Sequence, residues 1–259
     1  MTIALIISTY NWPGALEKVL AGVCRQYKLP DELIIADDGS GDETKRVIDE
    51  FSENYSGELQ HIWHEDKGFR KAIMLNRAIA ASRCSYIIFL DGDCVPHPSF
   101  ILDHAAQSQA DYWIQGRRAF IEQASIPFFD GTPSSFLRLW IKQRASGLFK
   151  GIRWPWEYVD RGTSLKGILG CNMAAWKKQL IEVNGFDEGY EGWGREDSDL
   201  GVRLYNSGYS RKTLYGRAVV YHLNHPQAPR GNLPANDNRL ARAIGGVYLK
   251  CDKGLSQYT

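Results

Sequence analysis

The chain has 259 residues, and its 31 basic residues nearly balance its 30 acidic ones, for a net charge of +1. This length supports a full hydrophobic core, and the balanced charge selects neither nucleic acid nor an anionic surface as a partner. The five cysteines form no Cys-x-x-Cys pair, which argues against a disulfide framework or a thiolate zinc site. No stretch approaches 18 apolar residues and no signal-peptide pattern is present, so we expect a soluble, cytoplasmic protein with reduced thiols.

Short apolar runs recur through the first third of the chain and predict four buried strands. These runs span residues 3–7, 33–36, 59–63 and 86–90. The helical patterns between them begin at Pro13, include Val47, Ile48 and Phe51, and run from Ala72 to Ala81. Strands separated by helices imply right-handed crossovers, so we expect an α/β, Rossmann-like domain with a mostly parallel central sheet flanked by helices.

The second half has weaker patterns. The elements expected there are strands at 111–121 and 216–222, a strand or loop at 167–176, and helices at 134–148, 197–206 and 239–250. Residues 224–238 carry three prolines and several asparagines, which predicts a mobile loop.

Two acidic clusters are the main candidates for functional residues. The apolar run at 86–90 ends directly in Asp91-Gly-Asp93, and a strand that delivers two carboxylates to its end can hold a cation. Taken alone, an Asp-x-Asp is more often an acidic surface turn. The second cluster, Glu196-Asp197-Ser-Asp199, and a histidine at the end of another apolar run, His222, favour the metal site.

Polar side chains follow each of the four strands. They lie at residues 8–11, 37–40, 64–67 and 91–93. Because the carboxyl ends of parallel strands meet at one edge of a sheet, we expect these groups to converge on one ligand site. Neither a dinucleotide-binding glycine fingerprint nor a P-loop is present.

The order of these motifs resembles that of family 2 glycosyltransferases of the GT-A fold. The matching pieces are residues 8–11, 37–40, 66–70 with Asn76, 89–93, 185–187 and 192–197. The last two also resemble the C-terminal part of galactosyltransferases and chondroitin-polymerase-type enzymes. The resemblance implies an inverting, metal-dependent transfer of a hexose or N-acetylhexosamine from a UDP-sugar to a hydroxyl of a glycan acceptor, in cell-surface polysaccharide or lipopolysaccharide synthesis.

The resemblance also implies a set of metal ligands. Asp93 is the expected direct ligand of Mn²⁺ or Mg²⁺, Asp91 reaches the ribose or the ion through water, and His222 supplies a third ligand. His225 is the substitute for His222, which otherwise is a hydrogen-bonded residue at a strand end. Nitrogen together with carboxylate oxygen suits Mn²⁺ slightly better than Mg²⁺.

Asp197 is the expected general base, because inverting transfer needs a carboxylate that accepts the proton of the attacking hydroxyl. The alternative is structural, since acidic residues in the first turn of a helix are favoured by the helix dipole. Trp193 between two glycines favours the catalytic interpretation, because an aromatic face suits the CH groups of a sugar. Glu196 and Trp193 are then acceptor contacts.

The resemblance places the expected nucleotide contacts at and near the ends of the other strands. Ser8 and Tyr10 are expected near the uracil or ribose, and Asp38 is expected to accept a hydrogen bond from the base. Tyr10 fits stacking and ordinary packing equally well. Asp66 belongs to the same substrate-binding group, and Arg70 offers a forked donor to the diphosphate.

We expect one domain, 1–259, with a nucleotide-binding half at 1–95, an acceptor-binding half at 96–223, and a mobile loop and helix at 224–259. Segment 136–156 mixes basic and aromatic residues, which fits either peripheral contact with the inner membrane surface and a lipid-linked acceptor or an amphipathic core helix. The alternative function is a catalytically silent nucleotide-sugar- or glycan-binding module. Such a module predicts a damaged base or metal motif, and both motifs are intact here.

Overall fold

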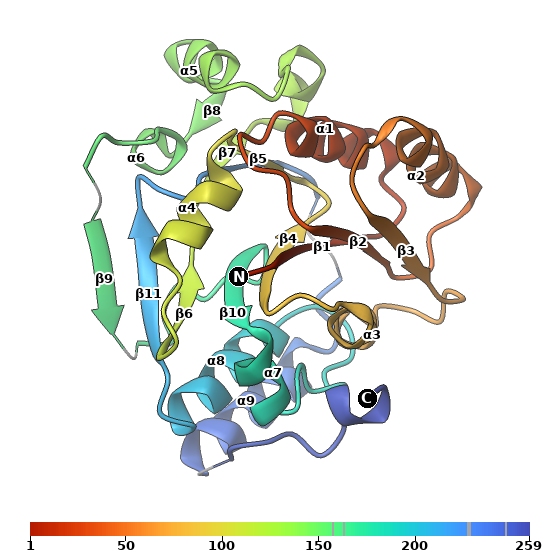
Figure 1. The fold of residues 1–259 in the computed structure, drawn as a ribbon, viewed down its shortest axis with the longest axis vertical. Coiled ribbons are helices and arrows are strands. Elements are labelled where there is room, and N and C mark those ends of the chain that lie inside the picture. Colours follow the sequence, from red (N-terminus) through yellow and green to blue (C-terminus); the bar gives the residue numbers. More distant parts are fainter. Residues whose placement is uncertain (157, 163, 227–228, 247) are drawn as a thin grey trace.

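The computed structural model describes residues 1–259 apart from residues 157, 163, 227–228 and 247. Its centre is an eight-stranded mixed sheet in the order β3-β2-β1-β4-β10-β6-β11-β9 (Figure 1). In that order the strands are Leu59–Trp63, Glu32–Asp37, Ile3–Thr9, Tyr86–Asp91, Asn172–Trp176, Tyr112–Gln115, Ser210–Tyr215 and Tyr158–Gly162. A four-stranded sheet, β5-β12-β7-β8, lies beside it, with strands Cys94–Pro96, Val220–Leu223, Arg118–Ile121 and Ala145–Ser146.

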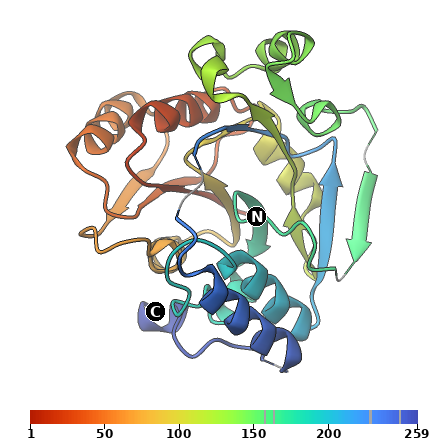
Figure 2. The same cartoon turned by 180° about the vertical axis from the view of Figure 1, so that it is seen from behind.

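Helices cover both faces of the large sheet. They are α1 Pro13–Cys24, α2 Asp42–Asn54, α3 Lys71–Ala81, α4 Phe100–Gln107, α5 Pro133–Ile141, α6 Leu148–Gly151, α7 Lys177–Glu182, α8 Glu196–Asn206 and α9 Leu233–Gly245, with 3₁₀ turns η1 Gln123–Phe128 and η2 Leu255–Gln257. Figures 1 and 2 show α1 and α2 together on one side of β1–β3, and α3 with α7–α9 on the other. The protein is therefore a three-layer α/β structure.

The apolar runs form buried strands because successive side chains enter two different cores. Ile3, Leu5 and Ile7 of β1 pack with α1, whereas Ala4 and Ile6 pack with α3. A strand that is covered on both faces carries no polar alternation, which is why β1, β2 and β4 are continuous apolar runs. Strands β3, β2, β1 and β4 pair in parallel, as the sequence predicts.

The second half adds antiparallel pairing that sequence reasoning did not anticipate. β10 runs antiparallel to both β4 and β6, and β9 runs antiparallel to β11. β6 and β11 pair in parallel. It follows that β4, β6 and β11 point the same way, so their carboxyl ends lie at the edge where β1 and β2 also end.

Several predicted boundaries in the second half were wrong. The strand expected at 111–121 is two strands in different sheets, because the chain bends at Gly116, where an added Cβ would lie 2.3 Å from the Asn172 side chain. The helix expected at 134–148 ends at Ile141, since the chain turns through a positive φ of 56° at Gln143 and then pairs β8 with β7.

The terminal helix begins at Leu233 rather than Arg239, so residues 233–238 are helical and not loop. A proline stands in its first turn, where proline is tolerated, and the proline-rich composition therefore misled the prediction. Residues 227–228 of the expected loop lie outside the described residues. No helix in the described part of the chain is long and apolar enough to cross a membrane. All five cysteines are unpaired and four are buried, as expected.

Candidate functional site

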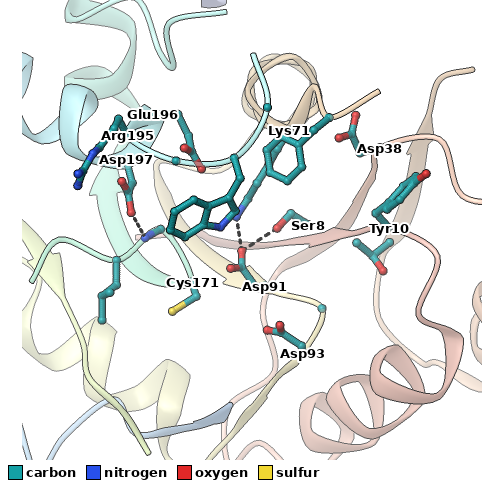
Figure 3. A pocket seen from close by; sticks show the side chains of 18 of the residues that line it. Ser8, Tyr10, Asp38, Lys71, Asp91, Asp93, Cys171, Arg195, Glu196 and Asp197 are labelled. Carbon is teal, nitrogen blue, oxygen red and sulfur yellow. Dashed lines mark hydrogen bonds and ion pairs between the residues drawn. The ribbon is translucent and has the colours of Figure 1, made fainter. Parts of the chain in front are cut away.

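A pocket of about 870 Å³ opens at the carboxyl edge of the large sheet (Figure 3). Its wall comes from the ends of β1, β2 and β4, the start of α3, the segment 168–171, and the loop that leads into α8. The predicted site residues on this wall are Ser8, Tyr10, Asp38, Asp91, Asp93, Trp193, Glu196 and Asp197. The strand ends thus converge as the topology predicts, and the acidic start of α8 joins them from the other side.

Asp91 is paired with a lysine that sequence reasoning missed. Lys71 Nζ lies 2.5 Å from Asp91 Oδ1, and Ser8 Oγ donates to the same oxygen at 2.8 Å. Burial alone would lower the pKa of Lys71, but the charges of Asp91 and Glu196 raise it. Lys71 is therefore a cation held among carboxylates on the pocket wall. The sequence feature that could have identified Lys71 is its position at the start of a helix, where the helix dipole disfavours a positive charge unless another group compensates it.

Asp93 and two histidines form a second cluster. Asp93 Oδ2 lies 3.4 Å from His222 Nε2 and 3.1 Å from His225 Nε2, and three ligand atoms of this cluster lie within 4.8 Å of one another. The strands place them: His222 on β12 pairs with Cys94 on β5, immediately after Asp93. Two imidazole nitrogens with one carboxylate oxygen fit a divalent transition metal such as Mn²⁺.

The members of this cluster shift one another's pKa values. Burial would raise the pKa of Asp93, but the hydrogen bond with His225 and the nearby His222 lower it below its usual value. The same hydrogen bond raises the pKa of His225, whereas burial lowers that of His222. A neutral His222 and an ionised Asp93 are the forms that bind metal. The cluster thus gathers Asp93, His222 and the substitute ligand His225, while Asp91 stays with Lys71.

One side of the pocket is built by the loop that leads into α8, which has left-handed backbone. Gly192 and Gly194 have φ values of 71° and 103°, and Trp193 between them presents its ring beneath Arg230, whose guanidinium carbon lies 4.9 Å from the ring centre. An added Cβ at Gly192 would lie 3.0 Å from the Asn232 side chain. Glycine is needed at these positions because it adopts positive φ without steric cost.

Asp197 lies in the first turn of α8 with both oxygens engaged. Oδ2 accepts from the Gly170 amide at 2.9 Å, and Oδ1 accepts from the Ser198 amide at 2.6 Å (Figure 3). These two amides fix the orientation of the carboxylate toward the pocket. Fixed orientation is what a base in a transfer reaction needs.

Glu196 differs from its neighbour. Its Oε2 is buried, and no hydrogen-bond partner for it exists among the described residues. Burial first and the charge of Asp197 second raise the pKa of Glu196 to about 7, while Lys71 opposes the shift. The pocket therefore holds one carboxylate that titrates near neutral pH beside one that is held by amides.

We expect Glu196→Gln to raise the free energy of unfolding by about 2 kcal/mol at pH 8 and by much less at pH 5. The folded-state pKa of about 7 exceeds the ordinary 4.5, so the cost of ionising Glu196 in the folded chain appears as the pH rises through this interval. Denaturant titrations at the two pH values measure the difference. Glu53→Gln, at an exposed site on α2, is the control, and equal effects of Glu196→Gln at both pH values would contradict the assignment.

Some of the predicted nucleotide contacts line the pocket, and others form hydrogen bonds with these wall residues from outside it. The Tyr10 hydroxyl donates to Asp66 Oδ2 at 2.8 Å, and the Arg70 amide donates to Asp38 Oδ2 at 2.8 Å. The Arg70 guanidinium donates to a carbonyl of its own loop, and neither Arg70 nor Asp66 lines the pocket. Lys71, and not Arg70, is thus the basic residue of this loop that faces the cavity.

Three other residues on the pocket wall have side chains that belong to none of the sequence motifs described above. They are Trp12, Arg118 and Cys171. The Arg118 guanidinium donates to Cys171 Sγ at 3.5 Å, so β7 and the segment before β10 meet at the pocket floor. The pairing of the second half of the chain brings Arg118 and Cys171 to the site, whereas Trp12 follows the end of β1 in the chain.

The fold and the strand-end acids define a GT-A glycosyltransferase scaffold. The structure is similar to S. aureus TarS 1–349, with a TM-score of 0.66 and 15% identity over 100% of this chain and 68% of that one. It is also similar to GalNAc-T7 in complex with UDP, GalNAc and Mn²⁺, with a TM-score of 0.67 and 14% identity over 94% of this chain and 48% of that one. At these identities the likeness establishes the fold alone.

The chain belongs to glycosyl transferase family 2, whose profile matches residues 4–149. Residues 156–226 match the family described as the N-terminal domain of galactosyltransferase. Chondroitin synthase of Escherichia coli is 26% identical over 94% of this chain and 36% of its own length. Hyaluronan synthase of Pasteurella multocida is 26% identical over 93% of this chain and 26% of its own length. The chain therefore spans about a third or less of these relatives.

Proposed function

We propose that this chain is an inverting, metal-dependent glycosyltransferase that moves a hexose or N-acetylhexosamine from a UDP-sugar to a hydroxyl of a glycan acceptor. The observation that carries the proposal is one pocket whose wall includes Asp93 and His225, which form the cation-binding cluster together with His222, and the carboxylates of Glu196 and Asp197. The named activities of the relatives, which are polysaccharide synthases, support a role in cell-surface polysaccharide or lipopolysaccharide synthesis.

The half at 1–95 binds the nucleotide in this proposal. Ser8 and Tyr10 contact the base or ribose, and Asp38 accepts a hydrogen bond from the base. Asp66 and Arg70 hold that loop through the contacts described above. A complex of TarS with UDP on the same fold supports a uridine nucleotide.

The cation cluster serves the leaving group. Asp93, His222 and His225 would hold Mn²⁺ or Mg²⁺, and Asp91 lies two residues away on the ribose side. A bound divalent cation neutralises charge that develops on the departing diphosphate. Lys71, paired with Asp91, adds a second positive charge at the same wall.

The half at 96–223 binds the acceptor, and the reaction occurs where the two halves meet. The acceptor hydroxyl oxygen forms a bond to the anomeric carbon while the bond from that carbon to the UDP oxygen breaks, and UDP leaves with the electron pair. Asp197 takes the hydroxyl proton, held in place by the Gly170 amide. Trp193 and Glu196 position the acceptor sugar. Attack opposite to the leaving group inverts the configuration, so an α-linked donor yields a β-linkage.

A screen of UDP-, GDP- and dTDP-sugars with and without Mn²⁺ tests the proposal. A ligand that binds only the folded state raises the melting temperature. We therefore expect UDP-sugars, but not GDP- or dTDP-sugars, to raise the melting temperature when Mn²⁺ is present. Release of UDP in the presence of a glycan acceptor then separates an enzyme from the alternative, a catalytically silent binding module. Binding of UDP-sugars without turnover for any acceptor would favour the binding module.

We also propose that the protein works at the cytoplasmic face of the membrane, where α5 makes peripheral contact. Leu137, Trp140 and Ile141 are exposed on this helix, with Lys142 directly after it. Apolar and basic side chains together suit an anionic lipid surface. Ile141→Ser is expected to reduce co-sedimentation with phosphatidylglycerol vesicles several-fold. Unchanged sedimentation of this variant would reject the contact.

A further inference from the structure

A second hollow, of about 280 Å³, lies outside the candidate active site, and the described residues that line it are all aromatic. These residues, the aromatic groove, are Phe149, Trp154, Trp156, Tyr158 and Tyr215. Phe149 and Trp154 are stacked with centres 5.8 Å apart, and Trp154 and Trp156 are stacked at 5.5 Å. Phe149, Trp156 and Tyr158 are 73%, 66% and 63% exposed. So much exposed aromatic surface in one place marks an interaction site.

One ring of the groove, that of Trp154, is held in place by its surroundings. Trp154 lies against Gly216, where an added Cβ would be 2.1 Å from the ring and where φ is 67°. The Trp154 indole donates to the Phe149 carbonyl at 3.3 Å, which fixes the ring between its two stacked neighbours. Preformed ring faces bind a ligand without the entropic cost of ordering side chains.

Hydrogen-bonding groups surround the rings. Arg117 Nη2 donates to the Tyr215 hydroxyl at 2.8 Å, and the guanidinium lies over the same ring, 4.9 Å from its centre. The Tyr158 ring packs at 5.4 Å from that of Tyr215. Two phenol hydroxyls and a guanidinium can form hydrogen bonds with sugar hydroxyls and carboxylates. Acyl chains have no groups that form such bonds.

The groove lies along the same sheet edge as the candidate active site. Tyr215 ends β11, Asp91 ends β4, and the two strands point the same way with β10 and β6 between them. Three strand spacings correspond to about 14 Å. Arg117 contacts the groove and the next residue, Arg118, lines the active-site pocket, so one connection joins the two sites.

The surrounding segment is basic. Residues 142–166 contain six basic residues and two acidic ones, in a chain whose net charge is +1. Arg153 is paired with the buried Asp103 at 2.8 Å, whereas Lys150 is exposed beside Phe149. Among the described basic residues, Arg117 lies against Tyr215 of the groove and Lys150 is the neighbour of Phe149 in the chain, and this charge suits an anionic ligand.

We propose that the aromatic groove binds the distal part of an acceptor glycan that carries carboxylates. The exposed surfaces of the Phe149, Trp156 and Tyr158 rings suit the CH faces of sugars, and the basic residues beside them suit uronic acid carboxylates. The inference rests on the proposed function, because a chain held here would extend along the sheet edge toward the transfer site.

Calorimetric titration of the full chain tests the proposal with two hexasaccharides. One alternates glucuronic acid with N-acetylglucosamine, and the other is the neutral N-acetylglucosamine hexamer. We expect the acidic probe to bind more tightly, and Trp156→Ala to weaken its binding about tenfold, a loss typical of one removed stacking partner. Phe128→Ala, at a 69% exposed aromatic residue outside the groove, is the matched control and should change nothing.

Separate titration with UDP and Mn²⁺ distinguishes failure of this inference from failure of the proposed function. UDP binding should be equal in Trp156→Ala and the wild type. Absence of UDP binding would reject the function and leave the glycan titrations standing. Binding of neither hexasaccharide, or equal binding by Trp156→Ala and wild type, would overturn the groove assignment. Loss of phosphatidylglycerol vesicle binding in Trp156→Ala, with glycan binding intact, would assign the groove to the membrane instead.

Discussion

Asp197→Asn is expected to lower kcat about a thousandfold while leaving UDP binding unchanged. Removal of a general base costs roughly 10² to 10⁴ in rate, because the hydroxyl proton then has no acceptor as the new bond forms. The isosteric asparagine keeps one acceptor oxygen for the amide of Gly170 or Ser198, whereas its NH2 group cannot accept from the other, so the melting temperature of the variant is compared with that of the wild type. Single-turnover transfer assays measure the rate, and calorimetry with UDP and Mn²⁺ measures the binding.

Two variants make this test specific. Glu191→Gln, an exposed acidic residue on the loop before α8, should keep full activity. Glu196→Gln should raise KM for the acceptor more than it lowers kcat if Glu196 only positions the acceptor. A fully active Asp197→Asn would remove the base assignment. An active Asp197→Asn with an inactive Glu196→Gln would transfer the role to Glu196, whose pKa of about 7 also suits a base.

Asp93→Ala is the second change with a large expected effect, and it should weaken both Mn²⁺-dependent UDP binding and transfer. Asp93 is the carboxylate of the cluster with His222 and His225, so its loss leaves two neutral ligands and no negative charge for the cation. We expect binding of UDP in the presence of Mn²⁺ to weaken at least about tenfold, since removal of even supporting groups costs 10- to 100-fold in metal affinity.

The readout for Asp93→Ala does not depend on turnover. Thermal stabilisation by Mn²⁺ with UDP should be lost, while the melting temperature without metal should stay close to that of the wild type. Asp130→Ala, at an exposed carboxylate paired with Arg138 away from the pocket, is the control. Undiminished Mn²⁺-dependent stabilisation in Asp93→Ala would show that the cation binds elsewhere.

The expected strand–helix order of the first half could be read from the sequence because its signals are local. The apolar run before Asp91 predicts a buried strand, and parallel pairing of such strands places Ser8, Asp38 and Asp91 at one edge. The structure confirms this convergence in the Ser8–Asp91 hydrogen bond. The acidic start of α8 was also readable, since Trp193-Gly-Arg-Glu-Asp is a contiguous motif.

Other features depend on pairs that are distant in sequence. Asp91 and Lys71 meet because the first residue of α3 lies beside the carboxyl end of β4, the strand that follows this helix in the chain, and no local pattern predicts their ion pair. His225 joins Asp93 because β12 lies beside β5. Strand direction in the second half was also beyond local reasoning, since an antiparallel and a parallel strand have the same apolar pattern when both faces are buried.

The sequence by itself determined the buried strands, the acids at their ends and the family they resemble, because side-chain periodicity and turn residues act over a few neighbouring positions. Only the tertiary structure decided which carboxylate faces the histidines, which faces Lys71, and which is left to titrate near neutral pH. It also assembled the aromatic groove from Phe149, Trp154, Trp156, Tyr158 and Tyr215. These outcomes depend on burial and on charges brought together by folding, and both are properties of the packed chain.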